Sequence, residues 1–241
     1  MSLEQLHDKS PAPRHDPIVT LDAVIFCWLN EELLVLLEKR RKEPFKDVLA
    51  VPGGYIHTDS DKTIDTGRDR ILREKVGFLP DYMEQLESVG GMDRDPRGWS
   101  VSIIYMCILK QDSPVLANLP EHLQLLPISQ VTGPDGVELA FDHREVINRA
   151  YQRLSSKTAY SSLPLLFMPR LFTMPMIINI HKAIMGTTPN KMSLHKRYKQ
   201  GDLIRKVPGE MLSLSGARIT DAYEATIVEP EMFSGSLGGG G

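Results

Sequence analysis

A tight Pro52-Gly53-Gly54 turn constrains the fold of this chain more than any other stretch. An apolar segment, residues 48–51, leads into the turn, and a polar segment follows it. Residues 61–76 then carry apolar side chains at helical spacing, and Gly77 stands where a helix-ending glycine is expected. Because glycine lets a backbone turn sharply or approach a ligand closely, we expect a strand, a turn and a helix beside a binding pocket. A plain turn is the alternative for the two glycines taken alone.

The composition is that of an ordinary globular protein. Of the 241 residues, 41% are hydrophobic and 24% are charged, which excludes a disordered or fibrous chain. We find no apolar run long enough for a membrane span and no secretory leader, so we expect a cytoplasmic protein without a membrane partner. Cys27 and Cys107 lie in apolar, strand-like runs and are expected to be reduced core thiols.

The first two thirds of the chain predict an α/β (α+β) domain. Strands alternate with two helices but without a regular βαβ repeat, which favours an α/β/α sandwich around a mixed sheet. In the first helix, Ile64, Ile71, Leu72 and Val76 are expected to face the core. The expected strands are residues 19–29, 33–38, 49–51, 84–89, 101–109 and 123–128, and the expected helices are 61–76 and 141–154.

The last third predicts a winged helix-turn-helix domain, because helix, short turn, helix and hairpin follow one another. Thr173 is expected to cap a helix that Gly186 ends, and Thr188 a second helix that Gly201 ends. The hairpin is expected at 203–207 and 222–228. A Ser/Pro-rich connection at 155–169 is expected to precede the whole domain. The expected parts are a flexible leader 1–17, a domain 18–155, a DNA-binding domain 156–230 and a flexible tail 231–241.

Charge is divided unevenly between the two parts. Residues 1–150 carry 17 basic against 25 acidic side chains, a net charge of −8, whereas residues 151–241 carry 11 against 6, a net charge of +5. A basic C-terminal part indicates a polyanionic partner, and double-stranded DNA fits the predicted fold. Leu194 and Tyr198 are expected to anchor the second helix. The expected DNA contacts are Asn190, Lys191, Ser193, His195, Lys196, Arg197 and Lys199 on this helix, and Arg218 on the wing; the alternative is a solvated basic helix without a partner.

The first helix and its turn resemble a Nudix box that has lost its metal ligands. Arg70, Leu72, Glu74 and Gly77 match the box, but Ile71 and Lys75 stand where two glutamates belong. Positions 71, 74 and 75 share one helix face, where three carboxylates would hold divalent cations against a pyrophosphate. We therefore expect no metal site and no catalytic residue, with Arg70 and Glu74 as vestiges. The acidic stripe of Asp61, Asp65 and Asp69 is expected to be solvated.

Several stretches together resemble the Nudix-related transcriptional regulators, and the similarity covers residues 18–228. They are 40–45, 50–55, 72–77, 84–86, 93–98, 102–105, 139–143, 160–164, 172–173 and 216–218. The resemblance implies a homodimeric repressor of genes of NAD metabolism. Its Nudix-like domain would bind ADP-ribose or a related nucleotide as effector, or a sugar as in one branch, and need no cofactor. The implied ligand residues are Arg40, Phe45, Gly53, Gly54, Arg94 and Arg97.

Alternatives remain open at the level of the site and of the function. Arg94 and Arg97 would otherwise form loop ion pairs with Asp93 or Asp95. Trp99, where many relatives have arginine, leaves the identity of the effector open. The alternative function is a Nudix hydrolase acting on ADP-ribose or another nucleoside diphosphate derivative, and a third is a ligand sensor whose C-terminal domain binds protein.

Overall fold

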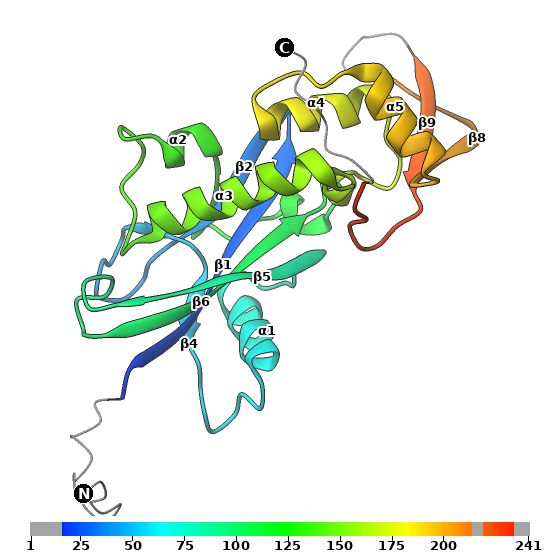
Figure 1. Ribbon diagram of the computed structural model, residues 1–241. Helices are drawn as coiled ribbons and strands as arrows, with labels where there is room; N and C mark the ends of the chain where they lie inside the picture. Colours follow the sequence, from blue (N-terminus) through cyan, green and yellow to red (C-terminus); the bar gives the residue numbers. More distant parts are fainter. Residues whose placement is uncertain (1–15, 214–218, 234–241) are drawn as a thin grey trace, which may run out of the picture.

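A mixed β-sheet forms the centre of the N-terminal part (Figure 1). The computed structural model describes residues 16–213 and 219–233, and within them this sheet has seven strands. Strand β1 (Ile18–Leu29) lies in the middle, antiparallel to β2 (Glu32–Lys39) and β4 (Gly53–Tyr55) and parallel to β6 (Ser100–Leu109). The remaining strands are β3 (Leu49–Ala50), β5 (Tyr82–Gly91) and β7 (Leu123–Pro127). The predicted mixed sheet and hairpin are confirmed.

Helices cover both faces of this sheet, so the residues of β1 from Leu21 to Trp28 are buried whichever face they point to. Helix α1 (Ile64–Lys75) packs Ile71 and Leu72 on one face. Helix α3 (His143–Tyr160) packs on the other face, beside the short helix α2 (Ile128–Thr132) (Figure 1). The expected sandwich is confirmed, but Ile64 is 44% exposed because it begins the helix next to the Thr63 cap.

Helix α3 is longer than the sequence predicts and crosses the boundary expected at residue 155. The polar stretch after Leu154 stays helical because Lys157 and Thr158 are buried, and Lys157 pairs with Glu84 of β5. The next segment, η3 (Leu163–Phe167), is a buried 3₁₀ helix. The predicted connection 155–169 is therefore wrong in its first part, and its second part belongs to the core.

The C-terminal part has the predicted order of elements: α4 (Met174–Met185), α5 (Lys191–Gln200), β8 (Ile204–Leu212) and β9 (Thr220–Ala225). Thr173 caps α4 and Gly186 ends it at φ 73°, as expected. The predicted cap of α5 at Thr188 is wrong. The side chain of Asn190 accepts the Ser193 N–H at 3.0 Å, so the helix begins two residues later.

One apolar core joins the two parts. It continues from Phe26 of β1 through Leu154 of α3 to Ile177 of α4 and Tyr198 of α5. Residues 231–233, predicted as part of a flexible tail, are held by backbone hydrogen bonds to residues 160 and 162. The sheet and helices α4 and α5 are therefore parts of one packed unit.

Two smaller expectations concern cysteine and membrane segments. Cys27 and Cys107 are buried and free, as predicted, and burial raises the pKa of the Cys27 thiol to about 12. Over residues 16–213 and 219–233, the helices lack the combination of length and apolarity that a membrane crossing needs.

Candidate ligand pocket and nucleic-acid interface

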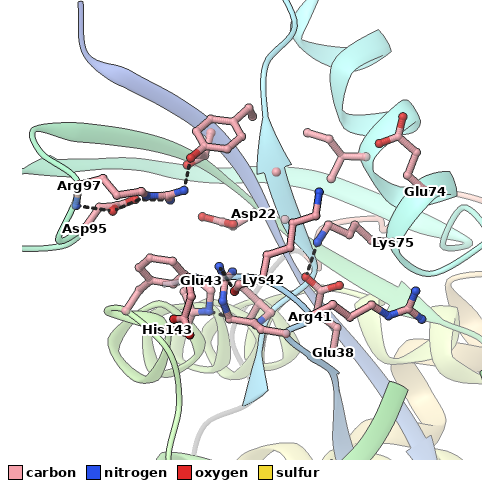
Figure 2. Close-up of a pocket in the computed structure, with 18 of the residues that line it drawn as sticks. Asp22, Glu38, Arg41, Lys42, Glu43, Glu74, Lys75, Asp95, Arg97 and His143 are labelled. Carbon is pink, nitrogen blue, oxygen red and sulfur yellow. Dashed lines mark hydrogen bonds and ion pairs between the residues drawn. The ribbon is translucent and has the colours of Figure 1, made fainter. Parts of the chain in front are cut away.

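A cavity of about 430 Å³ opens where the turn after β3, the end of α1 and the start of α3 meet β1 (Figure 2). Its lining is rich in charge of both signs. The cationic side chains are Arg40, Arg41, Lys42, Arg70, Lys75, Arg94 and Arg97, and the acidic ones are Asp22, Glu38, Glu43, Glu74 and Asp95. Such a cavity suits a ligand that carries phosphate groups and hydroxyls.

Five of the six predicted ligand residues line this cavity: Arg40, Gly53, Gly54, Arg94 and Arg97. Phe45 does not line it. Its ring packs edge-on against Phe141, with 4.8 Å between centroids, and Phe141 supplies the aromatic face in the cavity instead. The Arg40 guanidinium lies 4.7 Å from the centre of that ring. Phe141 precedes α3 and carries no local signal of a pocket, so the sequence did not identify it.

Both loop arginines have carboxylate partners. Arg94 donates to the two carboxylate oxygens of Asp142, at 3.0 Å each, so its predicted partners Asp93 and Asp95 are wrong. Arg97 pairs with Asp95 at 2.6 Å, as the ion-pair alternative predicts, and also contacts the Tyr55 hydroxyl. The pairs fix the direction of both guanidinium groups at the wall of the cavity.

The floor of the cavity contains buried titratable groups that the sequence did not single out. The Ser102 hydroxyl donates to Asp22 at 2.5 Å, and burial raises the pKa of that carboxyl to about 6. His143 accepts the Val51 N–H at 3.1 Å, and burial lowers its pKa to about 3. Gly53 lies directly over Asp22, since a Cβ added to it would stand 1.9 Å from Oδ1.

The helix face of the damaged box does not present a metal site. Ile71 is 3% exposed and packs beneath Gly54. Glu74 pairs with Arg70 at 3.1 Å, and Lys75 pairs with Glu38 at 2.9 Å. A divalent cation such as Mg²⁺ needs several oxygen ligands, and here its place holds a methyl-rich side chain and an ammonium. The described residues also contain no group of three or more His, Cys, Asp or Glu side chains able to hold a metal.

The acidic stripe of α1 is only partly solvated. The Asp61 side chain is 3% exposed and accepts from Arg70 at 2.7 and 2.8 Å and from the His57 N–H at 2.8 Å. These hydrogen bonds, that from Arg70 first, hold the pKa of Asp61 far below its usual value. The prediction of a solvated residue is wrong for Asp61, which fixes Arg70 beside the cavity, whereas Asp65 is exposed and pairs with Arg68.

Helix α5 presents a basic outer face. Lys191, Ser193, His195, Lys196 and Lys199 line one open hollow together with Met192. On the inner side Leu194 and Tyr198 are fully buried, as predicted.

Two of the predicted DNA-contacting residues have other contacts, and a third lies in an undescribed segment. The Arg197 guanidinium lies 4.8 Å from the Phe233 ring centre and donates to the Ala159 carbonyl at 3.4 Å, so it points toward the body of the protein. The Asn190 side chain caps the helix. Arg218 lies outside the described residues.

Fold and sites together define a ligand-binding transcriptional regulator in which a Nudix-type sandwich is joined to a winged helix. The chain is 32% identical over 218 residues to the ADPR responsive transcriptional repressor NtrR of Acinetobacter baylyi, covering 90% of this chain and 84% of that protein. It belongs to this family, the NrtR-type Nudix-related transcriptional regulators. No family model matches the sequence.

Solved structures of Shewanella oneidensis NrtR resemble the chain closely. The complex with a 27mer DNA has a TM-score of 0.77 at 31% identity, covering 86% of this chain and 93% of that one. The Nudix domain of the same S. oneidensis protein, complexed with ADP ribose, has a TM-score of 0.52 at 33% identity. This match covers 64% of this chain and 99% of that one. An ADP-ribose pyrophosphatase of Methanocaldococcus jannaschii is 27% identical over 131 residues, which cover 54% of this chain and 71% of that protein.

Proposed function

We propose that this chain is a transcriptional repressor whose affinity for DNA is controlled by ADP-ribose, or a related nucleotide, bound in the cavity. The observation that carries the proposal is that a cationic cavity and a basic helix belong to one packed unit, in a chain of the NrtR family. The S. oneidensis relative has been solved both with DNA and with ADP ribose, which supports the same pair of ligands here.

The chemistry of the cavity suits a nucleoside diphosphate sugar. One arginine guanidinium group can donate two parallel hydrogen bonds to a phosphate group. Arg40 and Arg97 are held at the wall of the cavity, with their guanidinium groups near Phe141. The Phe141 ring offers a face for a base to stack on. Gly53 and Gly54 bring the backbone to the ligand without a side chain.

Helix α3 offers a direct route from the ligand to DNA. Its first residues belong to the cavity, where Asp142 holds Arg94 and His143 holds the Val51 N–H. At its far end the Ala159 carbonyl accepts from Arg197 of α5. Small shifts of whole helices are one way in which proteins switch, and we propose that a shift of α3 at the cavity is passed to α5 through this contact. We therefore regard α3 as shared by the effector-binding and DNA-binding domains.

We further propose that the chain does not hydrolyse its ligand, although the pyrophosphatase relative shares the domain. Two of the three box positions that would hold catalytic metal are occupied by Ile71 and Lys75, and Glu74 is engaged by Arg70. Incubation with ADP-ribose and Mg²⁺ should therefore release no AMP. Release above a protein-free control, lost in Glu74→Gln, would restore the hydrolase.

The remaining proposals follow from the family. A homodimer would present two α5 helices to two half-sites of an operator, as winged-helix dimers do. The repressor would act in the cytoplasm on genes of NAD metabolism. The proposed DNA contacts are Lys191, Ser193, His195, Lys196 and Lys199.

Two assays test the function separately. Calorimetric titration with ADP-ribose, and with free ribose and glucose for comparison, tests the cavity. A gel shift on DNA from upstream of the chain's own gene tests DNA binding by α5. The double variant Lys191→Ala/Lys196→Ala is expected to bind this DNA more weakly. Binding of sugars but not of ADP-ribose would reassign the effector, and absence of retarded DNA would favour a partner protein.

A further inference from the structure

Lys75 stands at a box position where an intact Nudix box has a metal-binding glutamate, and it pairs with Glu38 of β2. The Lys75 Nζ lies 2.9 Å from Glu38 Oε1 at the cavity wall (Figure 2). The Glu38 side chain is 6% exposed and the Lys75 side chain 37% exposed. The carboxylate is thus the buried partner, and the ammonium is the one that faces the cavity.

Glu38 fixes the ammonium in this place. Burial raises the pKa of Glu38, and the charge of Lys75 opposes this rise, so the two charges depend on each other. Among the described residues Glu38 is the one hydrogen-bond partner of the Lys75 ammonium, which has three N–H donors. Two donor directions therefore remain for a ligand in the cavity.

Nearby cationic side chains disfavour a divalent metal ion at this point. Arg70, Arg41 and Lys42 also line the cavity, and a divalent ion would have to approach them as well as Lys75. The only carboxylate of the three box positions, Glu74, is already paired with Arg70. The cavity is built to meet a diphosphate with fixed protein cations.

Resting on the proposed nucleotide effector, we infer that Lys75 takes the place of the divalent cation, so that the diphosphate of the ligand binds without metal. Lys75 is the residue that neutralises the diphosphate, and Glu38 is the positioning residue that holds it. No bond is made or broken in this step. The ligand binds equally well in a chelator and in excess Mg²⁺.

The test is a calorimetric titration of the full chain with ADP-ribose, in EDTA and in excess Mg²⁺. The dissociation constant should be the same in both buffers. Lys75→Met should weaken binding by about tenfold or more, the scale of one hydrogen bond to a charged group. Lys62→Met removes the same charge from an exposed position outside the cavity and should leave the affinity unchanged.

A second variant guards against misfolding, because Lys75→Met leaves Glu38 buried without its partner. Glu38→Gln/Lys75→Met removes both charges, keeps the net charge of the chain, and should still bind weakly in both buffers. Conversely, Ile71→Glu/Lys75→Glu rebuilds the carboxylate face and should make binding depend on Mg²⁺.

The outcomes separate the two proposals. Binding that requires Mg²⁺ in the wild-type chain, or full affinity in Glu38→Gln/Lys75→Met, would overturn the role of Lys75 while leaving ADP-ribose as effector. No heat with ADP-ribose in either buffer would overturn the effector assignment, and with it this inference.

Discussion

At the scale of single residues, the cavity depends on a close approach between Gly53 and Asp22. A Cβ at Gly53 would stand 1.9 Å from Asp22 Oδ1 and 2.9 Å from the Leu21 carbonyl oxygen, whereas at Gly54 its nearest neighbour would be Ile71 at 3.4 Å. The sequence identified the glycine pair but could not tell the two apart. The residue beneath Gly53, Asp22, comes from β1, 31 positions earlier in the chain.

Gly53→Ala should therefore lower stability more than Gly54→Ala. We expect Gly53→Ala to lower the free energy of unfolding by about 1–3 kcal/mol, the usual cost of overpacking, and to weaken ADP-ribose binding. Urea denaturation and calorimetry of the two variants measure both effects. Equal behaviour of the two variants would contradict the arrangement of the turn over Asp22.

Both loop arginines should weaken ADP-ribose binding when replaced by alanine. Arg97→Ala should weaken binding by about 1.5–3 kcal/mol, and it should also lower stability, because the Asp95 side chain is only 6% exposed and loses its partner. The Arg94 side chain is 10% exposed and is bonded to Asp142 next to the start of α3. Arg94→Ala should therefore lower the stability of the protein as well as the affinity for ADP-ribose. Calorimetry and thermal unfolding separate the two effects, and unchanged affinity in both variants would place the ligand elsewhere.

At the scale of elements, the sequence predicted most strands and helices, and the misses have physical causes. Helix α3 was cut short because the serines at 155 and 156 were taken as the start of a Ser/Pro-rich connection, whereas Lys157, directly after them, is buried against Glu84. The start of α5 was misplaced because Thr188 and Asn190 are both good caps, and only the hydrogen bond to Ser193 decides between them. The wrong partner for Arg94 arose because Asp142 lies 48 residues away.

The basic residues of helix α5 fall into two groups: three lysines face outward, and Arg197 points toward the body of the protein. Lys191→Ala, Lys196→Ala and Lys199→Ala should each lower DNA affinity and reduce the slope of log K against log salt by about 0.9, the value for one lost phosphate contact. Arg197→Ala should instead lower thermal stability, because Arg197 contacts Phe233 and the Ala159 carbonyl. Fluorescence anisotropy over a salt series measures the slopes, with Lys46→Ala, an exposed lysine of the first domain, as control. Unchanged slopes in all three lysine variants would move the DNA interface off α5.

At the scale of the whole molecule, one apolar core connects the domain that contains the cavity to the DNA-binding helices. No sequence pattern predicted this shared core. The sequence predicted two domains joined by a linker, but the apolar residues of η3 and α4 belong to the same core as those of β1 and α3. Hydrophobic periodicity shows that a face is buried and does not show which element buries it. Because the two domains share this core, we expect them to unfold together in one transition.

Stability should fall on mild acidification, because two buried histidines stay neutral in the folded chain. Burial lowers the pKa of His143 and of His181 to about 3, so these two side chains bind protons only in the unfolded chain as pH falls below about 6.5. Asp22, whose pKa is raised to about 6, opposes this trend. We expect a net loss of about 1 kcal/mol between pH 7.5 and 6 in urea denaturation. His181→Gln, which keeps a hydrogen bond to Tyr198, should flatten the dependence, and an equally steep curve in this variant would contradict the role of His181.

The central claim is that the cavity and α5 are energetically coupled, and one titration tests it most directly. Fluorescence anisotropy of the labelled upstream DNA gives the affinity of the full chain with and without saturating ADP-ribose. The account predicts a change of at least about fivefold, the lower end of typical allosteric coupling, and an equal change in ADP-ribose affinity when DNA is bound. DNA and ADP-ribose binding together with unchanged affinities would contradict it.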